Sequence, residues 1–211
     1  MTSLRSGLLL TTLAFALVLP VHAQERGRYR DGGGQADAQP SPAEVEREIA
    51  DGVNEARENN GLPPLPVSRL LTQVARAHVR DLDQHHPDAG VGAAGRPCSV
   101  HSWSAHGRWS AVCYTGAMSE AARMWSKPRE VTGGAYPYNG YEIAVGYPPG
   151  QGDGVFITAD AALRAWRDSP AHRDTMLERG VWSARRWRAM GIGVEGGYAV
   201  VWFGPGVDPK A

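Results

Sequence analysis

Three polar side chains with acid–base and metal-binding chemistry lie in apolar or aromatic stretches of this 211-residue chain. His101 opens a His-Ser-Trp-Ser run, Glu142 stands in Tyr-Glu-Ile-Ala, and His172 follows Ser-Pro-Ala. A carboxylate within a short apolar strand must be paired, hydrogen-bonded or metal-bound, because an isolated buried charge is strongly unfavourable. Two imidazoles are suitable partners for it, so we expect these three residues to converge in the fold.

Two histidines and one glutamate support more than one chemistry. His101, His172 and Glu142 could hold a divalent metal such as zinc with one coordination position open, or they could form an acid–base cluster. The alternative is a buried hydrogen-bonded network that only orients the walls of a cleft. Spacing alone does not decide between them, since no two of these residues are close along the chain.

The sequence lacks several common functional motifs. It contains no Gly-x-Ser-x-Gly elbow, no His-Glu-x-x-His helix, no phosphate-binding Gly-Lys-Ser/Thr loop and no paired CxxC. Its 22 basic and 22 acidic residues give a formal net charge of zero. A nucleic-acid-binding protein would show a basic patch or a high pI. The standard hydrolase, nucleotide-binding and nucleic-acid-binding classes are therefore disfavoured.

The first 23 residues have the pattern of a secretory signal peptide. Arg5 precedes a mostly apolar run over residues 8–19, and Val21-His22-Ala23 ends in a small residue. The apolar run is shorter than the about 20 residues that a membrane-spanning helix needs. We therefore expect cleavage after Ala23 and a periplasmic or extracellular protein.

Export affects the interpretation of the two cysteines. Cys98 and Cys113 lie 15 positions apart in a segment rich in Gly, Ser and Trp. An even cysteine count in an oxidising compartment favours a disulfide, with two buried free thiols as the alternative. A two-cysteine zinc site would normally need closer spacing.

The elements that position these residues begin after a leader. Residues 24–40 have almost no large aliphatic side chains, which predicts disorder. A domain over residues 41–207 then opens with Ser41 and Glu44, a capping box at a helix start. Apolar spacing predicts helices over residues 42–60 and 68–83, and His78 lies on the apolar face of the second. There, a core histidine with one hydrogen-bond partner is expected more readily than a ligand.

The rest of the chain alternates short helices and strands. A short helix is expected over residues 119–125, ending at Lys127-Pro128, and two more are expected from Thr158 and Ser169. Strands are predicted at residues 141–145, 190–195 and 198–203, the last two joined as a hairpin by a Gly-Gly pair. The order of elements predicts an α+β domain with helices packed on an antiparallel sheet.

Several short motifs together resemble the CAP superfamily, which comprises the cysteine-rich secretory proteins, antigen five and the plant pathogenesis-related group one proteins. The resemblance extends from about residue 43 to residue 204. It rests on the order and spacing of Asn54-Glu-Ala-Arg57, Gly61-Leu-Pro-Pro-Leu65, His101-Ser-Trp, Tyr141-Glu-Ile-Ala144, the stretch 166–173, Gly191-Ile-Gly-Val194 and Val201-Trp-Phe-Gly204.

The resemblance implies an α-β-α sandwich with a small central antiparallel sheet, flanked by helices. It also implies extracellular residence and a cleft lined by two histidines and two acidic residues. His101 and His172 are similar to the two cleft histidines, and Glu142 to the glutamate of a Gly-Glu-Asn-Ile-like motif. This chain differs by having Tyr141 between Gly140 and Glu142.

A second departure concerns the fourth cleft residue. The second glutamate of animal members would fall at Ser169 in this chain, with Asp168 or Glu130 as substitutes. The resemblance therefore assigns three of the four cleft residues directly.

The resemblance implies a binding function without a defined reaction. We expect an exported CAP-domain protein whose cleft binds a small ligand, a lipid, a metal or an envelope component. One alternative is a metal-assisted secreted hydrolase, a peptidase or esterase, with Glu142 as base or ligand. Another is a surface interaction protein that uses the aromatic segment 103–114, although such aromatics more often fill a core. We expect a monomer with no nucleic-acid partner and no membrane span after signal cleavage.

Overall fold

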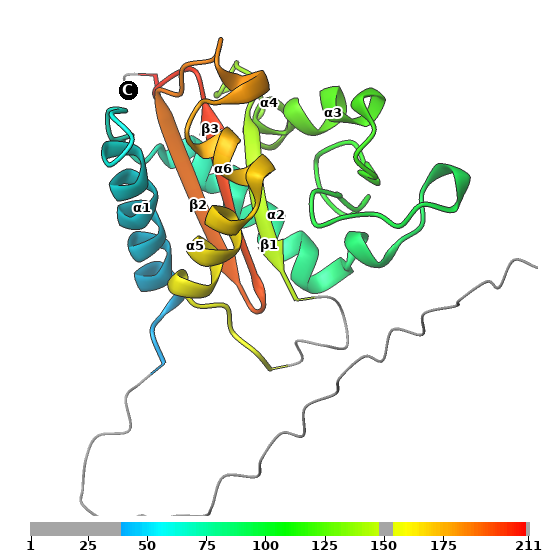
Figure 1. Cartoon of the computed structure of the whole chain (residues 1–211). Helices are drawn as coiled ribbons and strands as arrows, with labels where there is room; N and C mark the ends of the chain where they lie inside the picture. The colour runs from blue at the N-terminus through cyan, green and yellow to red at the C-terminus, as the bar shows by residue number, and fades with distance from the viewer. Residues whose placement is uncertain (1–38, 148–153, 210–211) are drawn as a thin grey trace, which may run out of the picture. The chain divides into compact units, whose positions relative to one another are not determined.

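The computed structural model describes residues 39–147 and 154–209. The predicted signal peptide, residues 1–23, and nearly all of the predicted leader lie outside them. The described residues form one α+β unit, as predicted (Figure 1). Its helices are α1 Pro42–Glu58, α2 Arg69–His85, α3 Met118–Trp125, α4 Lys127–Val131, α5 Ala159–Asp168 and α6 Pro170–Met176. Its strands are β1 Tyr141–Gly146, β2 Ala189–Glu195 and β3 Tyr198–Gly204.

The three strands form one antiparallel sheet in the order β1-β3-β2. Strands β2 and β3 make the predicted hairpin, in which Gly196 adopts a φ of +49° that favours glycine. Strand β1 pairs with the other edge of β3, which places Glu142 opposite Trp202. Since successive strand residues face opposite sides, Glu142 and Ile143 project from different faces of the sheet.

Helices cover both faces, so the α-β-α sandwich is confirmed (Figure 1). On one face, Ile143 and Val201 pack with residues of α1 and α5 in a single apolar cluster. On the other face, α2 lies very close to β2. A Cβ atom added at Gly191 would stand 2.1 Å from the backbone carbon of Leu71, and one at Gly193 would meet the backbone of Ala75 at 2.4 Å. The two glycines therefore permit the close approach that seats α2 on the sheet.

Most helix starts follow the capping residues seen in the sequence. Ser41 and Glu44 form the complete capping box of α1. The side chains of Ser68, Thr158 and Ser169 each accept a hydrogen bond from the backbone N–H three residues ahead. These caps fix where α2, α5 and α6 begin.

The short helix predicted over residues 119–125 is α3, which ends before Lys127-Pro128 as expected, but a further helix that the sequence did not predict follows it. Helix α4 starts there, with Pro128 in its first turn, where the missing N–H of proline costs nothing. Lys127 is fully buried, and its ammonium donates to the Glu130 carboxylate at 3.0 Å. The Lys-Pro pair therefore marks both the end of α3 and the start of α4.

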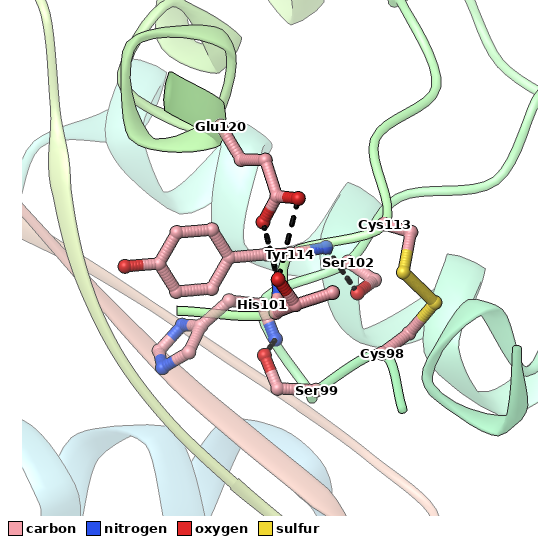
Figure 2. The surroundings of a disulfide bond; sticks show 8 residues. Cys98, Ser99, His101, Ser102, Cys113, Tyr114 and Glu120 are labelled. Carbon is pink, nitrogen blue, oxygen red and sulfur yellow. Dashed lines mark hydrogen bonds between the residues drawn. A yellow bond between two sulfur atoms is a disulfide. The ribbon is translucent and has the colours of Figure 1, made fainter. Parts of the chain in front are cut away.

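The predicted disulfide between Cys98 and Cys113 is confirmed. It joins two segments that also share backbone hydrogen bonds: the Ser99 N–H donates to the Tyr114 carbonyl at 2.9 Å. The Tyr114 N–H donates to the Ser102 hydroxyl at the same distance (Figure 2). The disulfide therefore holds together the two chain segments that carry His101 and Tyr114.

Candidate functional site

Glu142 is the centre of a buried network between β1 and α2. Its side chain points to the sheet face that α2 covers and is fully buried. One carboxylate oxygen contacts Nδ1 of His78, and the other lies 2.7 Å from Nδ1 of His101. Both oxygens of the carboxylate are thus engaged by imidazole rings from segments 64 and 41 residues away along the chain.

His78 is a core residue, as expected, but it has two hydrogen-bond partners and belongs to the site. Its Nε2 lies 3.0 Å from the carbonyl oxygen of Ser102, and its ring stacks on Trp103 with centroids 4.1 Å apart. A carbonyl oxygen only accepts, so Nε2 carries a proton and donates it. Nδ1 faces the Glu142 carboxylate, so both ring nitrogens of His78 point at oxygen acceptors.

The network keeps Glu142 ionised. Burial by itself raises the pKa of Glu142. The positive charge of His78 and the hydrogen bonds from His101 and His78 outweigh burial and lower the pKa from 4.5 to about 2. Glu142 is therefore a carboxylate at any physiological pH, and it fixes Nδ1 of His101 as a donor.

His172, on α6, lies beside this network. Its ring centroid lies 6.0 Å from that of His101. Burial, followed by the nearby charge of His101, lowers the pKa of His172 from 6.5 to about 4, although Glu142 acts in the opposite direction. Burial is the main cause of this lowered pKa. At neutral pH, His172 offers an uncharged imidazole with a nitrogen that accepts a hydrogen bond.

The three predicted residues share the wall of one cavity of about 640 Å³. This volume lies within the range of small-molecule sites. Its lining combines the polar network with aromatic and aliphatic side chains from α3, α6 and the turn around Trp182, and we call this cavity the cleft. Its other lining residues are Tyr114, Ala121, Met124, Trp125, Ala171, Asp174, Thr175, Gly180, Val181, Trp182 and Arg185.

A family model described as CAP, the cysteine-rich secretory protein family, matches residues 50–107. That segment runs from the middle of α1 through α2 to the loop that carries His101. The matched segment includes motifs that resemble the CAP superfamily, among them Asn54-Glu-Ala-Arg57 and His101-Ser-Trp. Among curated proteins, no significant match was found.

Several solved structures of bacterial proteins are similar to this chain. An extracellular protein with an SCP domain from Bacillus anthracis str. Ames is 15% identical, with a TM-score of 0.47 over 81% of this chain and 45% of that one. A cysteine-rich secretory protein from Staphylococcus aureus subsp. aureus Mu50 is 15% identical, with a TM-score of 0.47 over 82% and 40%. An outer surface protein from Borrelia burgdorferi is 14% identical, with a TM-score of 0.48 over 78% and 95%. The chain spans less than half the length of the first two.

The residues that the sequence suggested for the fourth position of the cleft do not line it. Ser169 caps α6, and Asp168 at the end of α5 does not line the cleft. Glu130 accepts from the backbone N–H of Ser110 at 2.6 Å, also outside the cleft. The second carboxylate in the lining is Asp174, which the chain pattern did not single out.

The disulfide positions one side of the cleft. Tyr114, next to Cys113, meets the ring of His101 edge-on with centroids 5.7 Å apart, and both rings line the cavity (Figure 2). In the same segment, Trp103 is buried and exchanges backbone hydrogen bonds with Val112. Trp103 thus belongs to the core and Tyr114 to the cleft wall.

The donor set does not fit a zinc ion held by three protein ligands. Both oxygens of Glu142 accept from imidazole nitrogens, which leaves His101, His172 and Asp174 as the possible metal ligands in the described lining. Within residues 39–147 and 154–209, no group of three or more His, Cys, Asp or Glu side chains is arranged to hold a metal ion. Catalytic zinc sites usually have three protein ligands. Metal binding stays a prediction, and no step below depends on it.

The described residues include no helix that is both long and apolar enough to cross a membrane.

Proposed function

We propose that this CAP domain is an exported binding protein whose cleft takes a small ligand with an apolar body and a hydrogen-bonding group. The observation that carries the proposal is the meeting of His101, Glu142 and His172, from three distant segments, on the wall of one aromatic-lined cavity. Export is supported by the signal-peptide pattern of residues 1–23 and by the disulfide.

The polar end of the cleft provides imidazole nitrogens in defined states. Nδ1 of His101 donates to Glu142, so Nε2 is the nitrogen of that ring left for a ligand. His172, whose pKa is about 4, is neutral at pH 7 and can accept a hydrogen bond. A hydroxyl or amide N–H on the ligand would pair with this acceptor.

The apolar end is formed by two indoles. The rings of Trp125 and Trp182 meet at 74° with centroids 6.4 Å apart, so they form two adjoining walls. Met124 and Val181 line the same space. Burying a ligand against this surface provides most of the expected binding free energy, because apolar burial contributes roughly 25 cal/mol per Å².

The network favours binding over proton transfer. Glu142 is a weak base, with a pKa of about 2 and both oxygens engaged. His172, with a pKa of about 4, is also far from the near-neutral value that suits a general base. The hydroxyl of Thr175, which lines the cleft, already donates to the Ala171 carbonyl at 2.9 Å. Glu142, His172 and Thr175 therefore offer the hydrolase alternative neither a well-matched base nor a free nucleophile.

The experiment that tests the proposal is a titration of the purified protein with Nile red, a neutral dye that fluoresces in apolar sites. We expect saturable binding that Trp182→Ala weakens strongly. Trp109→Ala is the matched control, because Trp109 is half-buried but does not line the cleft. Equal binding by the two variants would place the dye elsewhere and contradict the proposal. Turnover of ester or peptide substrates that His172→Ala abolishes would support the hydrolase instead.

A further inference from the structure

A second cavity, of about 300 Å³, lies between the end of α1 and the helices α5 and α6. It shares no lining residue with the cleft. Three arginines line it: Arg167 from α5, Arg173 from α6 and Arg179 from the turn that follows. We call this the arginine cavity.

Two of the three guanidiniums are already held in place by neutral partners. Arg173 donates through Nη1 to the carbonyl oxygen of Arg167 at 3.0 Å. Arg179 donates through Nη2 to the side-chain oxygen of Asn60, which also lines the cavity, at 2.6 Å. Since a guanidinium has five N–H donors, each retains donors for a ligand. These two guanidinium groups are thus held in position while they keep their full positive charge.

The positive charges of the arginine cavity have no carboxylate partner in the part of the chain that the structure describes. No acidic oxygen there lies within 4.0 Å of a guanidinium nitrogen of Arg167, Arg173 or Arg179. Two neighbouring arginines contrast with them. Arg57 is paired with Glu178 at 2.9 Å, and Arg164 is paired with Asp160 at 2.6 Å.

Helix ends account for only part of this charge. Arg167 and Arg173 lie in the last turns of α5 and α6, where each offsets roughly half a negative charge of the helix dipole. Glu55 supplies one carboxylate on the cavity wall. Three full positive charges exceed these negative contributions, so the cavity remains cationic.

We propose that the arginine cavity binds a tetrahedral oxyanion of the phosphate type, independently of the proposed cleft ligand. The planar fork of arginine matches pairs of phosphate oxygens, and such charge-assisted hydrogen bonds are the strong ones. Asn59 and Asn60 on the rim add amide groups at the end of α1. The phosphate is either free or part of an anionic lipid headgroup, and the two sources share this chemistry.

The test is isothermal titration of the full chain with inorganic phosphate at low ionic strength. We expect saturable binding that weakens with added salt, because exposed charges are screened. Arg167→Gln and Arg173→Gln should each weaken binding by about tenfold or more, which corresponds to losing one hydrogen bond to a charged group. Arg164→Gln is the matched control, since it removes the same charge from the same helix but outside the cavity.

Equal phosphate affinity in Arg164→Gln and Arg173→Gln would overturn the proposal, as would the absence of saturable binding below about 10 mM. Arg179→Gln, at an exposed position, gives the same comparison if Arg173→Gln unfolds. Cosedimentation with phosphatidic acid vesicles, lost in Arg179→Gln and absent with phosphatidylcholine, would identify a lipid headgroup. Phosphate binding without cosedimentation would identify free phosphate. Nile red binding in the cleft should be unchanged in all these variants, which separates this site from the proposed function.

Discussion

Replacing Glu142 with Gln removes the charge at the centre of the buried network while keeping its shape. The carboxylate accepts from two imidazole nitrogens, and an amide oxygen can replace only one of these contacts. The amide N–H₂ of the glutamine would then face the N–H of the other imidazole, so two donors would meet. The buried His78 ring would also no longer contact a negative charge. Breaking a buried ion pair by removing one partner is strongly destabilising.

The free energy that the ionised Glu142 contributes to folding follows from its lowered pKa. Lowering it from 4.5 to about 2 corresponds to about 3 kcal/mol of folding free energy at pH 7. Because the folded pKa is the lower one, this contribution is fully present above about pH 4.5 and is lost as the pH falls through about 2. At pH 3.5 it should still be about 2 kcal/mol.

The assay is urea unfolding of the wild type and of Glu142→Gln at pH 7 and at pH 3.5. At each pH, the free energy of unfolding of the variant is subtracted from that of the wild type. The difference matters because the pKa of Glu130 is also lowered to about 2, and its effect on the wild-type stability cancels. The exposed Glu48→Gln serves as the control for loss of one carboxylate. The reasoning is refuted if Glu142→Gln is no more destabilising than Glu48→Gln, or if its effect does not shrink at the lower pH.

Three further outcomes are expected. Replacing Cys98 and Cys113 together with Ser should lower the unfolding free energy by about 3 kcal/mol, the value for a loop of 15 residues, and a non-reducing peptide map that finds free thiols would contradict the disulfide. Ser41→Ala should lower the free energy of unfolding, measured with urea, by about 1 kcal/mol, because it removes the N-terminal cap of α1. An unchanged free energy of unfolding would mean that the capping box is not formed in solution. The ring protons of His172 should show no NMR titration between about pH 5.5 and 8, because its pKa in the folded protein is about 4. Since this pKa is below 6.5, the neutral ring contributes folding stability that is lost as the pH falls from 6.5 to 4. A titration midpoint near 6.5 would contradict the burial of this ring.

The fold was largely predictable because its helix starts and its hairpin are encoded locally. Ser41, Thr158 and Ser169 cap helices through hydrogen bonds to backbone groups only three residues away. The hairpin strands are separated by just two glycines. Such short-range signals can be read from a single sequence, whereas the buried Lys127 is stabilised by contacts with Ser110, 17 residues away, and could not be recognised as part of a helix start.

The candidate site was predictable only in part. A glutamate in an apolar strand predicts that its carboxylate has hydrogen-bond partners. The order of the motifs that resemble the CAP superfamily indicated His101 and His172 as the histidines of the cleft. That His78 would be the second partner of Glu142 depends on the register of β1 against α2, which no local pattern reveals. Asp174 enters the cleft through the orientation of the short helix α6, and the arginine cavity forms only when α1, α5 and α6 pack together.

Native mass spectrometry of the protein purified from its own host shows whether the cleft holds a small ligand. Both the periplasm and the culture medium should be sampled, with elemental analysis of the same preparations. We predict a bound organic mass that is released on denaturation and is missing from Trp182→Ala but retained by Trp109→Ala. Wild-type protein with only the mass of the processed chain, or with a bound mass that Trp182→Ala retains in full, would contradict the account.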